Sequence, residues 1–422
     1  MRLRRQRQQH KRKIQGLREI AGLFNIFDER RKKMNKLRIG IIGCGIQGKF
    51  YRDIIDGVDL ERYGIKKAPG NCKVTAVATS NSDTAKTFQE IHGITVFKNW
   101  KKLIESDCCD AVIITLPHLL HHEPAMYALE HGKHVLCEKP MCIRLSDAEK
   151  LVQVKEKHPE LTLAMMFNQR ANPLYRSIKE MAEKKELGSL RRSNWLINDW
   201  WRPDQYYTSG PWRGSYSKEG GGILVNQLPH NLDLWAWICG APKKIFAKCI
   251  QGAYRDIPVE NDITIVAEYE NGVTGTIVSC THDPLGTNRL ELDFSKGKII
   301  LENGKKLTIY RFHQDEKEWN HTYDHYTFQN MKRENEAALY DMEAREVETT
   351  YGNDHSEALR NFAEHILSGE ALYSDYQDGL LENQIAAAAQ LSGWTGKEIC
   401  MPPKAEEYDA AMDVQIAKEQ IK

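Results

Sequence analysis

The sequence contains a glycine-rich motif whose spacing suits phosphate binding. Residues 43–48 read Gly-Cys-Gly-Ile-Gln-Gly and lie between an apolar run (37–43) and a helical stretch (46–55). The first glycine permits a tight turn, the second lets the backbone approach a pyrophosphate, and the third lets helix and strand pack closely. A purely structural turn is the alternative, but the strand–helix context favours a ligand. We therefore predict dinucleotide contacts at Gly43, Gly45, Ile46, Gln47 and Gly48.

The second apolar run ends in Ala78-Thr79-Ser80-Asn81. An acid at this point would bind the ribose hydroxyls of NAD, whereas an arginine would bind the 2′-phosphate of NADP. The sequence has neither, and Thr79, Ser80 and Asn81 could form hydrogen bonds with both cofactors. The prediction is NAD, with NADP left open.

Three histidines follow a later apolar strand at its carboxyl end, where ligands of such sheets lie. His118, His121 and His122 could suggest a metal, but no carboxylate or thiolate at a suitable spacing supports a metal site. We expect no metal, and instead ring contacts to the cofactor or capping of the next helix. The predicted cofactor contacts are Leu116, Pro117, His118 and His121.

Glu138-Lys139-Pro140 ends the next strand, so both charged side chains are expected beside the cofactor. A lysine normally titrates near pH 10.4, but desolvation lowers its pKa toward neutrality. Lys139 could then accept a hydroxyl proton or stabilise a developing alkoxide. A solvent-exposed lysine at a strand end is the alternative, and the spacing alone leaves both open.

A second dense motif, GGGILVNQLPHNLD, spans residues 220–233. If one helix begins near Gly222, Asn226 and His230 share a face, and Pro229 should kink the helix near His230. A histidine on such a helix is often a core residue, but two polar side chains facing one way favour a site. We predict substrate contacts at Asn226, Gln227 and His230.

Residues 199–216 are rich in tryptophan and tyrosine, interleaved with arginine and aspartate. Flat aromatic faces beside charged hydrogen-bonding groups suit a sugar ring, although a domain or subunit interface uses the same residue types. The predicted substrate contacts in and before this segment are Arg170, Trp200, Trp201, Tyr207, Trp212 and Arg213.

Apolar strands that alternate with helices predict an α/β fold with a doubly wound parallel sheet. The expected strands are 37–43, 73–79, 110–117, 134–138 and 161–167. The expected helices are 46–55, 82–92, 121–130 and one opened by a capping box from Ser146 to Glu149. We assign a Rossmann domain to residues 37–160.

After residue 168 the pattern changes. Long alternating strands between residues 244 and 311, joined by turn signals such as Glu-Asn-Gly, predict an open and mainly antiparallel sheet with one face covered. Helices are expected near 355–369 and 384–394. We assign residues 161–422 to a C-terminal domain for substrate binding and oligomerisation.

The charge of the chain is unevenly distributed. The 422 residues have a net charge of +1, but residues 1–36 contain thirteen Lys or Arg and only three acids. This basic arm, at +10, leaves the rest of the chain at −9, which suits a neutral sugar better than an anionic substrate. We expect the arm to contact a neighbouring subunit; a flexible tail and a membrane-surface anchor are the alternatives.

Composition excludes other classes of function. No run of 18 apolar residues occurs, so no membrane-spanning helix is expected, and the near-neutral total gives no reason to expect nucleic acid. The ten cysteines form no CxxC pair, which suggests reduced thiols and a cytoplasmic protein.

In combination, these motifs resemble a known family. GCGIQG, then LPHLLHHEPAMYALEHGKHVLCEKP, then GGGILVNQLPHNLDLWAW follow the order of the glucose–fructose oxidoreductase and inositol dehydrogenase family (Gfo/Idh/MocA) over nearly all of residues 37–400. The resemblance implies a Rossmann domain, a second α/β domain that often mediates oligomerisation, a nicotinamide cofactor and a sugar or cyclitol substrate. By position, Lys139 is similar to the active-site lysine and His230 to the histidine of the second motif. Asn226 stands where many members have aspartate, and His118 where many have asparagine.

The second motif with the preceding YYxSGPWRGSYxxEGGG resembles a subgroup that oxidises glucosides at position 3. The predicted function is therefore NAD(P)-dependent oxidation of a secondary hydroxyl of a sugar or glycoside, with Lys139 and His230 handling the proton. The alternatives are an inositol or other sugar dehydrogenase, a glycosidase that recycles its NAD, and a non-catalytic sugar-sensing regulator. We expect a homo-oligomer.

Overall fold

A computed structural model describes residues 36–421, apart from residues 92 and 349. Its first part is a six-stranded sheet in the order β3-β2-β1-β4-β5-β6, and all neighbouring strands are parallel. The order reverses between β1 and β4, which is where such sheets bind ligands. The strands are β1 (Leu37–Ile42), β2 (Cys72–Ala78), β3 (Thr95–Phe97), β4 (Ala111–Ile114), β5 (His134–Cys137) and β6 (Leu163–Met165). The predicted doubly wound parallel sheet is confirmed.

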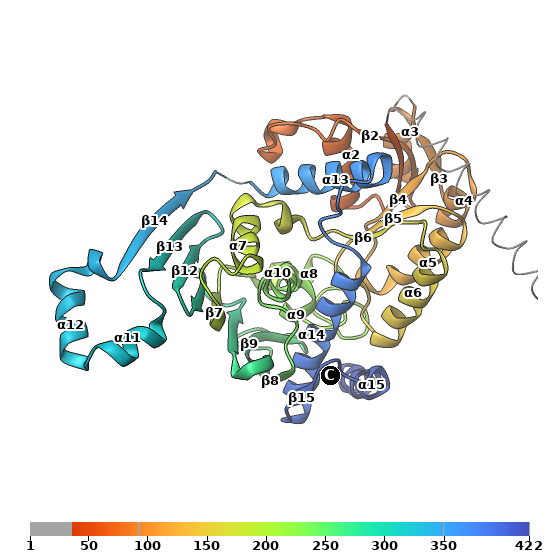
Figure 1. Cartoon of the computed structure of the whole chain (residues 1–422). Coiled ribbons are helices and arrows are strands. Elements are labelled where there is room, and N and C mark those ends of the chain that lie inside the picture. The colour runs from red at the N-terminus through yellow and green to blue at the C-terminus, as the bar shows by residue number, and fades with distance from the viewer. Residues whose placement is uncertain (1–35, 92, 349, 422) are drawn as a thin grey trace, which may run out of the picture.

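Helices cover both faces of this sheet. They are α2 (Ile46–Asp56), α3 (Ser82–Gln89), α4 (Trp100–Glu105), α5 (His122–Glu130), α6 (Leu145–Lys157) and, from far along the chain, α13 (Tyr351–Ser368). In Figure 1, α13 lies beside α2, and Leu359, Phe362 and Ile366 are buried in one cluster with Leu37 and Ile54. A late segment of the chain therefore completes the core of the first domain.

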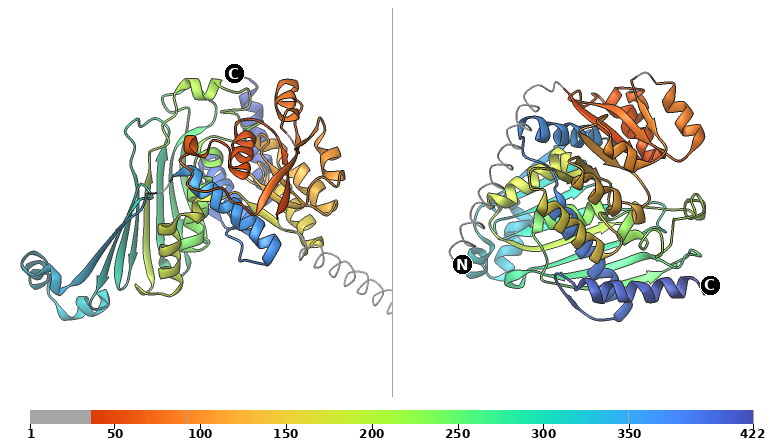
Figure 2. Two further views of the ribbon diagram at one scale, coloured as in Figure 1. Left: turned by 90° about the horizontal axis from the view of Figure 1, so that it is seen from above. Right: turned by 90° about the vertical axis from the view of Figure 1, so that its right-hand side faces the viewer.

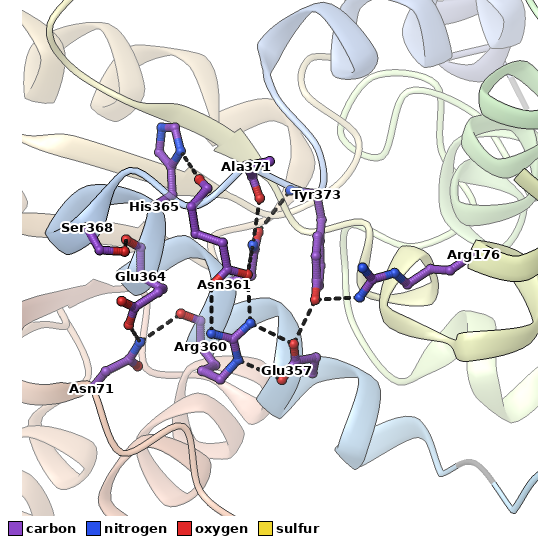
Figure 3. A network of polar contacts seen from close by, with 11 residues as sticks. Asn71, Arg176, Glu357, Arg360, Asn361, Glu364, His365, Ser368, Ala371 and Tyr373 are labelled. Carbon is purple, nitrogen blue, oxygen red and sulfur yellow. Dashed lines mark hydrogen bonds and ion pairs between the residues drawn. The ribbon is translucent and has the colours of Figure 1, made fainter. Parts of the chain in front are cut away.

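Hydrogen bonds hold α13 in place (Figure 3). Asn71, just before β2, donates to the Arg360 carbonyl oxygen at 2.9 Å. The Arg360 guanidinium pairs with Glu357 at 2.9 Å and with Glu370 at 2.8 Å. Tyr373 donates to Glu357 at 2.7 Å and accepts from Arg176 of α7 (Pro173–Glu183) at 2.7 Å. The network thus connects the first sheet to the second half of the chain.

The predicted capping box at the start of α6 is wrong. The N-cap residue is Arg144, two residues before the expected N-cap Ser146, and no side-chain hydrogen bond caps this helix end from within α6. Instead, Asp409 accepts from the backbone N–H groups of Leu145 at 3.2 Å and Ser146 at 3.4 Å. Asp409 belongs to α15 (Ala405–Glu419), so a distant element satisfies this helix end.

The second part is a nine-stranded sheet in the order β14-β13-β12-β11-β7-β10-β9-β8-β15. Only β7 and β10 are parallel neighbours, and the other pairs are antiparallel. The predicted open, mainly antiparallel sheet is therefore confirmed. The strands are β7 (Leu190–Ile197), β8 (Lys244–Gln251), β9 (Glu260–Glu268), β10 (Thr274–Cys280), β11 (Asn288–Phe294), β12 (Gly297–Glu302), β13 (Lys306–Phe312), β14 (Tyr340–Glu346) and β15 (Ile399–Cys400).

One face of this sheet packs against α7, α10 (Pro229–Cys239) and α14 (Tyr376–Thr395), around the main apolar core. Figure 2 shows these helices gathered on the side of the sheet that faces the first domain. On the other face, Phe246, Val266 and Val278 are 45, 45 and 36% exposed. The sheet is thus covered on one side only.

Shorter elements complete the chain. They are α8 (Asp204–Thr208), α9 (Ile223–Asn226), α11 (Glu316–Thr322), α12 (His325–Glu334) and 3₁₀ turns at Leu60–Tyr63, His118–Leu120, Asn168–Ala171, Glu270–Gly272 and Glu336–Ala338. The hairpin of β13 and β14 with α11 and α12 projects away from the rest of the molecule (Figure 1). Within the described residues, no helix combines the length and apolar character needed to cross a membrane.

The domain limits stay a proposal. Strand β6 lies past residue 160 but pairs with β5, and α13 joins the first domain's core. A boundary after β6, with α13 as a returning element, fits these contacts better than a cut at residue 160. The predicted basic arm at residues 1–36 lies, except for Lys36, outside the described residues.

Candidate active site

The glycine motif forms the turn between β1 and α2. Gly43 has φ +96°, a conformation that favours glycine. A Cβ on Gly48 would lie 2.1 Å from the Gly43 carbonyl oxygen, so helix and turn touch there. A Cβ on Gly45, by contrast, would meet nothing within 4 Å. The fold itself therefore requires the first and third glycines, and open space lies over the second.

The N-terminus of α2 offers donors to an anion. Its N-cap is Gly45, no side chain caps it, and the first acidic residue lies beyond its first turn. The first backbone N–H groups of a helix have no intrahelical partner and carry a partial positive charge. Ile46, at 90% exposed, leaves this end accessible. The residues present thus fit the pyrophosphate of a dinucleotide.

Glu138 positions this turn from the end of β5. Its carboxylate accepts hydrogen bonds from the Tyr51 hydroxyl of α2 and, at 3.2 Å, from the Lys139 backbone N–H. Burial raises the pKa of Glu138, while the Lys139 charge and bonds from Tyr51 and Gln47 lower it. Glu138 and Gln47, both predicted as cofactor contacts, therefore bind each other and fix β5 against α2.

The residues after β2 lie at the same sheet edge. The Asn81 side-chain oxygen accepts from the Thr84 N–H at 2.8 Å and caps α3, so this oxygen is already in use. The Thr79 hydroxyl accepts from the Asn81 N–H at 3.3 Å, and Ser80 is exposed. Ribose contacts of Thr79, Ser80 and Asn81 stay a proposal. Of the three side chains, that of Ser80 is the least occupied by hydrogen bonds within the protein.

His121 joins two loops instead of facing a ligand. Its ring nitrogens lie 2.8 Å from the Pro140 carbonyl oxygen and 2.7 Å from that of Leu116, and the side chain is 1% exposed. These contacts leave its ring nitrogens no free position for a cofactor. Leu116 packs against Gly43, and Pro117 precedes the His118–Leu120 turn.

Lys139 follows β5 and reaches across to the second domain. Its Nζ donates to the Asn226 carbonyl oxygen at 2.6 Å. Burial lowers the pKa of Lys139, while the charges of Glu138, Glu219 and Glu382 raise it. An amine with a lowered pKa at this edge is suited to exchange a proton with a hydroxyl group.

The second motif forms two helices, not the single kinked helix predicted. α9 ends at Asn226 and α10 begins at Pro229, where a missing N–H is tolerated. His230, in the first turn of α10, is buried, and within the described residues its Nδ1 has no hydrogen-bond partner. Burial, then the Lys139 charge, lowers the pKa of His230 well below its usual value. His230 is therefore a neutral imidazole near Lys139, with one ring nitrogen unpaired.

Two buried acids near Lys139 were missed in the sequence analysis. Glu219 accepts from the Asn226 side-chain amide and from the Gly214 N–H, and burial raises its pKa to about 7. Glu382 of α14 is fully buried, neither carboxylate oxygen has a partner within the described residues, and burial raises its pKa to about 8. The acid before the glycine triplet was a visible signal for Glu219, whereas Glu382 lies in an ordinary helical sequence.

The aromatic segment is stacked on its own arginines. The Arg202 guanidinium lies 5.4 Å from the Trp200 ring and 4.9 Å from the Tyr206 ring. Arg213 lies 4.3 Å from Tyr206 and 4.5 Å from Trp212. The predicted aromatic faces are thus partly covered by cation–π contacts.

The same segment meets the first domain. The Trp212 ring packs edge-on against His118 at 5.2 Å, and His118 Nδ1 lies 2.9 Å from the Glu219 carbonyl oxygen. These contacts favour the domain-interface interpretation for Trp212. Trp201 is 44% exposed, and Tyr207 shares a 3.0 Å hydrogen bond with Thr281.

The Tyr206 hydroxyl accepts hydrogen bonds from several polar side chains of this region. It accepts from Asn226 Nδ2 at 2.9 Å, from Gln227 Nε2 at 3.2 Å and from Arg213 at 2.5 Å. Three predicted substrate contacts, Asn226, Gln227 and Arg213, therefore lie together around this hydroxyl group. Tyr206 itself was not among the predicted contacts. Their contact with a substrate stays a proposal.

Arg170 requires a correction. Its guanidinium forms buried ion pairs with Asp233 at 2.6 Å and Asp378 at 2.8 Å and donates to the Tyr373 carbonyl oxygen at 2.8 Å. It also borders a cavity of about 470 Å³ whose lining includes neither Lys139 nor His230. Because its donors are already engaged, Arg170 connects α10 to α14 and does not face the substrate.

Within the described residues, no group of three or more His, Cys, Asp or Glu side chains could hold a metal ion. His118 and His121 come within 5.8 Å of each other, but both have nitrogens directed at backbone carbonyls.

Comparisons with known proteins agree with this geometry. A family described as oxidoreductase with an NAD-binding Rossmann fold matches residues 37–166, and the GFO/IDH/MocA C-terminal domain matches residues 175–300. Myo-inositol 2-dehydrogenase of Thermotoga maritima is 24% identical over 279 residues, 65% of this chain and 77% of that protein. Levoglucosan dehydrogenase of Pseudarthrobacter phenanthrenivorans is 24% identical over 298 residues, 64% of this chain and 74% of that protein.

A solved structure shares the fold. WlbA dehydrogenase of Chromobacterium violaceum, in complex with NADH and UDP-GlcNAcA, has a TM-score of 0.71 and 22% identity. The alignment covers 88% of this chain and 98% of that one.

A parallel sheet with a glycine turn at its switch point is the architecture of dinucleotide-binding proteins, and the matching family model describes an NAD-binding oxidoreductase. Since the two family models together match more than half of the chain, it belongs to the Gfo/Idh/MocA oxidoreductase family. The resemblance inferred from the motifs is confirmed, as is the prediction of an NAD-binding enzyme.

Proposed function

We propose that this protein is an NAD-dependent dehydrogenase that oxidises a secondary hydroxyl group of a sugar or glycoside. The observation that carries the proposal is that Lys139, at the sheet edge next to the glycine turn, lies close enough to the buried His230 of α10 for its charge to lower the pKa of His230. Burial lowers the pKa of both groups, which makes the proton-accepting neutral form of each more accessible. A dinucleotide-binding protein without this chemistry would not need them there.

The residues divide the work as follows. NAD, held by Gly43, Gly45 and the N-terminus of α2, would accept the hydride from the carbinol carbon. Lys139, held by the Asn226 carbonyl oxygen, takes the hydroxyl proton in its neutral form. His230 orients the hydroxyl through a hydrogen bond and is the alternative proton acceptor.

The relatives act on neutral polyols or on nucleotide sugars, by their names. Here the arginines of the aromatic segment are already engaged, because Arg202 and Arg213 stack on aromatic rings. This supports a neutral substrate over a sugar phosphate. Within that class, the second motif leads us to propose position 3 of a glucoside.

The test is the absorbance of reduced nicotinamide across a panel of glucosides, free sugars and inositols, with NAD and NADP in separate reactions. We expect NAD reduction with at least one glucoside, and product analysis should find the 3-keto sugar. Release of aglycone without accumulating reduced cofactor would instead identify a cofactor-recycling glycosidase. Binding of NADH without turnover of any polyol would contradict the dehydrogenase proposal.

The homo-oligomer is also proposed, not established. The open face of the second sheet carries Phe246, Val266 and Val278, of which Phe246 and Val266 are paired across β8 and β9. Light scattering on the purified protein, with Val266→Lys as a variant, tests this surface. A monomeric mass for the unaltered protein would contradict the proposal.

A further inference from the structure

We propose that Glu219 is a positioning residue of this active site, which orients the Asn226 amide and supplies a negative charge that acts on Lys139. The inference rests on the dehydrogenase function proposed above.

The contacts of Glu219 lead directly to Lys139. The residue is 2% exposed and lies in a turn, just before the glycine triplet. One carboxylate oxygen accepts from Asn226 Nδ2, and the other accepts from the Gly214 N–H. The backbone carbonyl oxygen of the same residue, Asn226, accepts from Lys139 Nζ at 2.6 Å. Asn226 therefore stands between the acid and the amine, with one group on each side.

Glu219 also anchors the first domain. Its backbone carbonyl oxygen lies 2.9 Å from His118 Nδ1, on the loop after β4. Burial lowers the pKa of His118 well below its usual value, so His118 is neutral and can donate this hydrogen bond. A displacement of Glu219 would therefore change the hydrogen bonds of Asn226 and His118 and the charge near Lys139.

The charged and titratable groups around Glu219 come from three segments. Arg213 and Lys139 lower its pKa, as do the bonds from Gly214 and Asn226, while burial raises it to about 7. The phenol groups of Tyr206 and Tyr207 are neutral, because burial raises the pKa of both. Glu219 therefore changes charge near neutral pH, within reach of an amine whose pKa it raises.

The sign of the effect on Lys139 follows from these charges. A negative charge nearby favours the protonated amine. Glu219→Gln removes that charge and should lower the pKa of Lys139 by about one unit. Oxidation needs the neutral amine, so the acidic limb of its pH profile should move to lower pH by the same amount. Without the Glu219 carboxylate, the Asn226 amide is no longer held in position, and this should also lower kcat about 10-fold with KM nearly unchanged.

The experiment compares four proteins: the unaltered chain, Glu219→Gln, the double variant Glu219→Gln/Asn226→Asp, and Glu180→Gln as control. In the double variant, residue 226 carries the carboxylate and residue 219 the amide, so the hydrogen bond between these two positions can still form with its donor and acceptor exchanged. Glu180 is an exposed acid of α7 that pairs with Lys184, so its loss should change nothing at the site. The first readout is kcat and KM against pH for the best polyol substrate. The second is the pKa of Lys139, measured without substrate by competitive acetylation and mass spectrometry.

We expect Glu219→Gln to shift both pH midpoints downward and the double variant to restore them and most of kcat. An unchanged Lys139 midpoint in Glu219→Gln, or no recovery in the double variant, would overturn the proposal. Should Glu219→Gln not fold, Glu219→Asp takes its place, and an unchanged midpoint and kcat there would likewise overturn it. The acetylation measurement needs no substrate, so it tests the role of Glu219 separately from the proposed function. If no polyol is oxidised, only the proposed function fails.

Discussion

The two sides of this active site are built in different ways. On the Rossmann side, backbone groups at the ends of β1, β4 and β5 form the site, and a six-residue glycine turn fixes them. On the other side, Glu219, Asn226 and His230 come from one continuous segment and Glu382 comes from α14, and together they place three buried titratable groups in this region. The comparison indicates that cofactor binding depends on local backbone freedom, whereas the chemistry depends on an electrostatic balance across the whole fold.

Lys139→Met tests the residue where the two sides meet, and it should have the largest effect. It removes the amine but keeps an apolar stem of similar length, so kcat for polyol oxidation should fall about 10³-fold. NADH affinity should stay within about threefold, because the glycine turn is unaltered. Steady-state kinetics and fluorescence titration with NADH check both. A variant that keeps full turnover would remove Lys139 from the mechanism.

Gly48→Ala tests the backbone side. Its Cβ would lie 2.1 Å from the Gly43 carbonyl oxygen, so either helix or turn must move, at a cost of about 1–3 kcal/mol in stability. NADH affinity should fall about 100-fold, which corresponds to about 2.7 kcal/mol. Thermal unfolding and NADH titration measure the two effects.

Gly45→Ala is the matched control for Gly48→Ala. A Cβ at Gly45 meets open space, so its stability should be unchanged while the methyl group obstructs the pyrophosphate. Equal stability losses in the two variants would contradict the distinction between a glycine required by the fold and one required by a ligand.

The same comparison explains what the sequence could predict. Glycine spacing, strand ends and the position of Lys139 are local features, and five of the six strands of the first sheet were visible as apolar runs. The three-residue strand β3 was missed. Strand β14 was missed because its side chains are half-exposed or exposed, which leaves no buried face to detect, and it is held by backbone pairing with β13. Helix α15 was missed because its apolar residues form no clear stripe.

Side-chain partnerships between distant segments were beyond the sequence pattern. Arg170 looked like a substrate-binding cation, but Asp233 and Asp378, 63 and 208 residues away, neutralise it. Glu382 was not singled out in the sequence, and α14 buries it. In both cases the tertiary fold supplied the missing information.

Glu382→Gln tests the cost of a buried charge on the second side. The folded-state pKa of about 8 lies above the unfolded value near 4.5, so the carboxyl group prefers to be protonated in the fold. Its contribution to stability is fully present below about pH 4.5 and is lost as the pH rises toward 8. The variant cannot ionise and should gain about 1–3 kcal/mol on the unaltered protein between pH 5 and pH 8.

Urea unfolding at pH 5 and pH 8 measures this gain. The fixed cost of burying an amide cancels between the two pH values, so only the ionisation of Glu382 remains. A stability difference that does not change with pH would show that Glu382 has an ordinary pKa in the fold.

The smallest expected effect concerns the start of α6, where local pattern and tertiary structure disagree. Asp409 of α15 accepts from the Leu145 and Ser146 N–H groups, whereas the Ser146 side chain caps nothing. Asp409→Ala should therefore cost about 1 kcal/mol, the usual value of a lost helix cap, and Ser146→Ala only a few tenths. Urea unfolding of both variants gives the ranking. If Ser146→Ala were the more costly, the local capping box would govern this helix after all, and a sequence pattern would outweigh a contact 263 residues away.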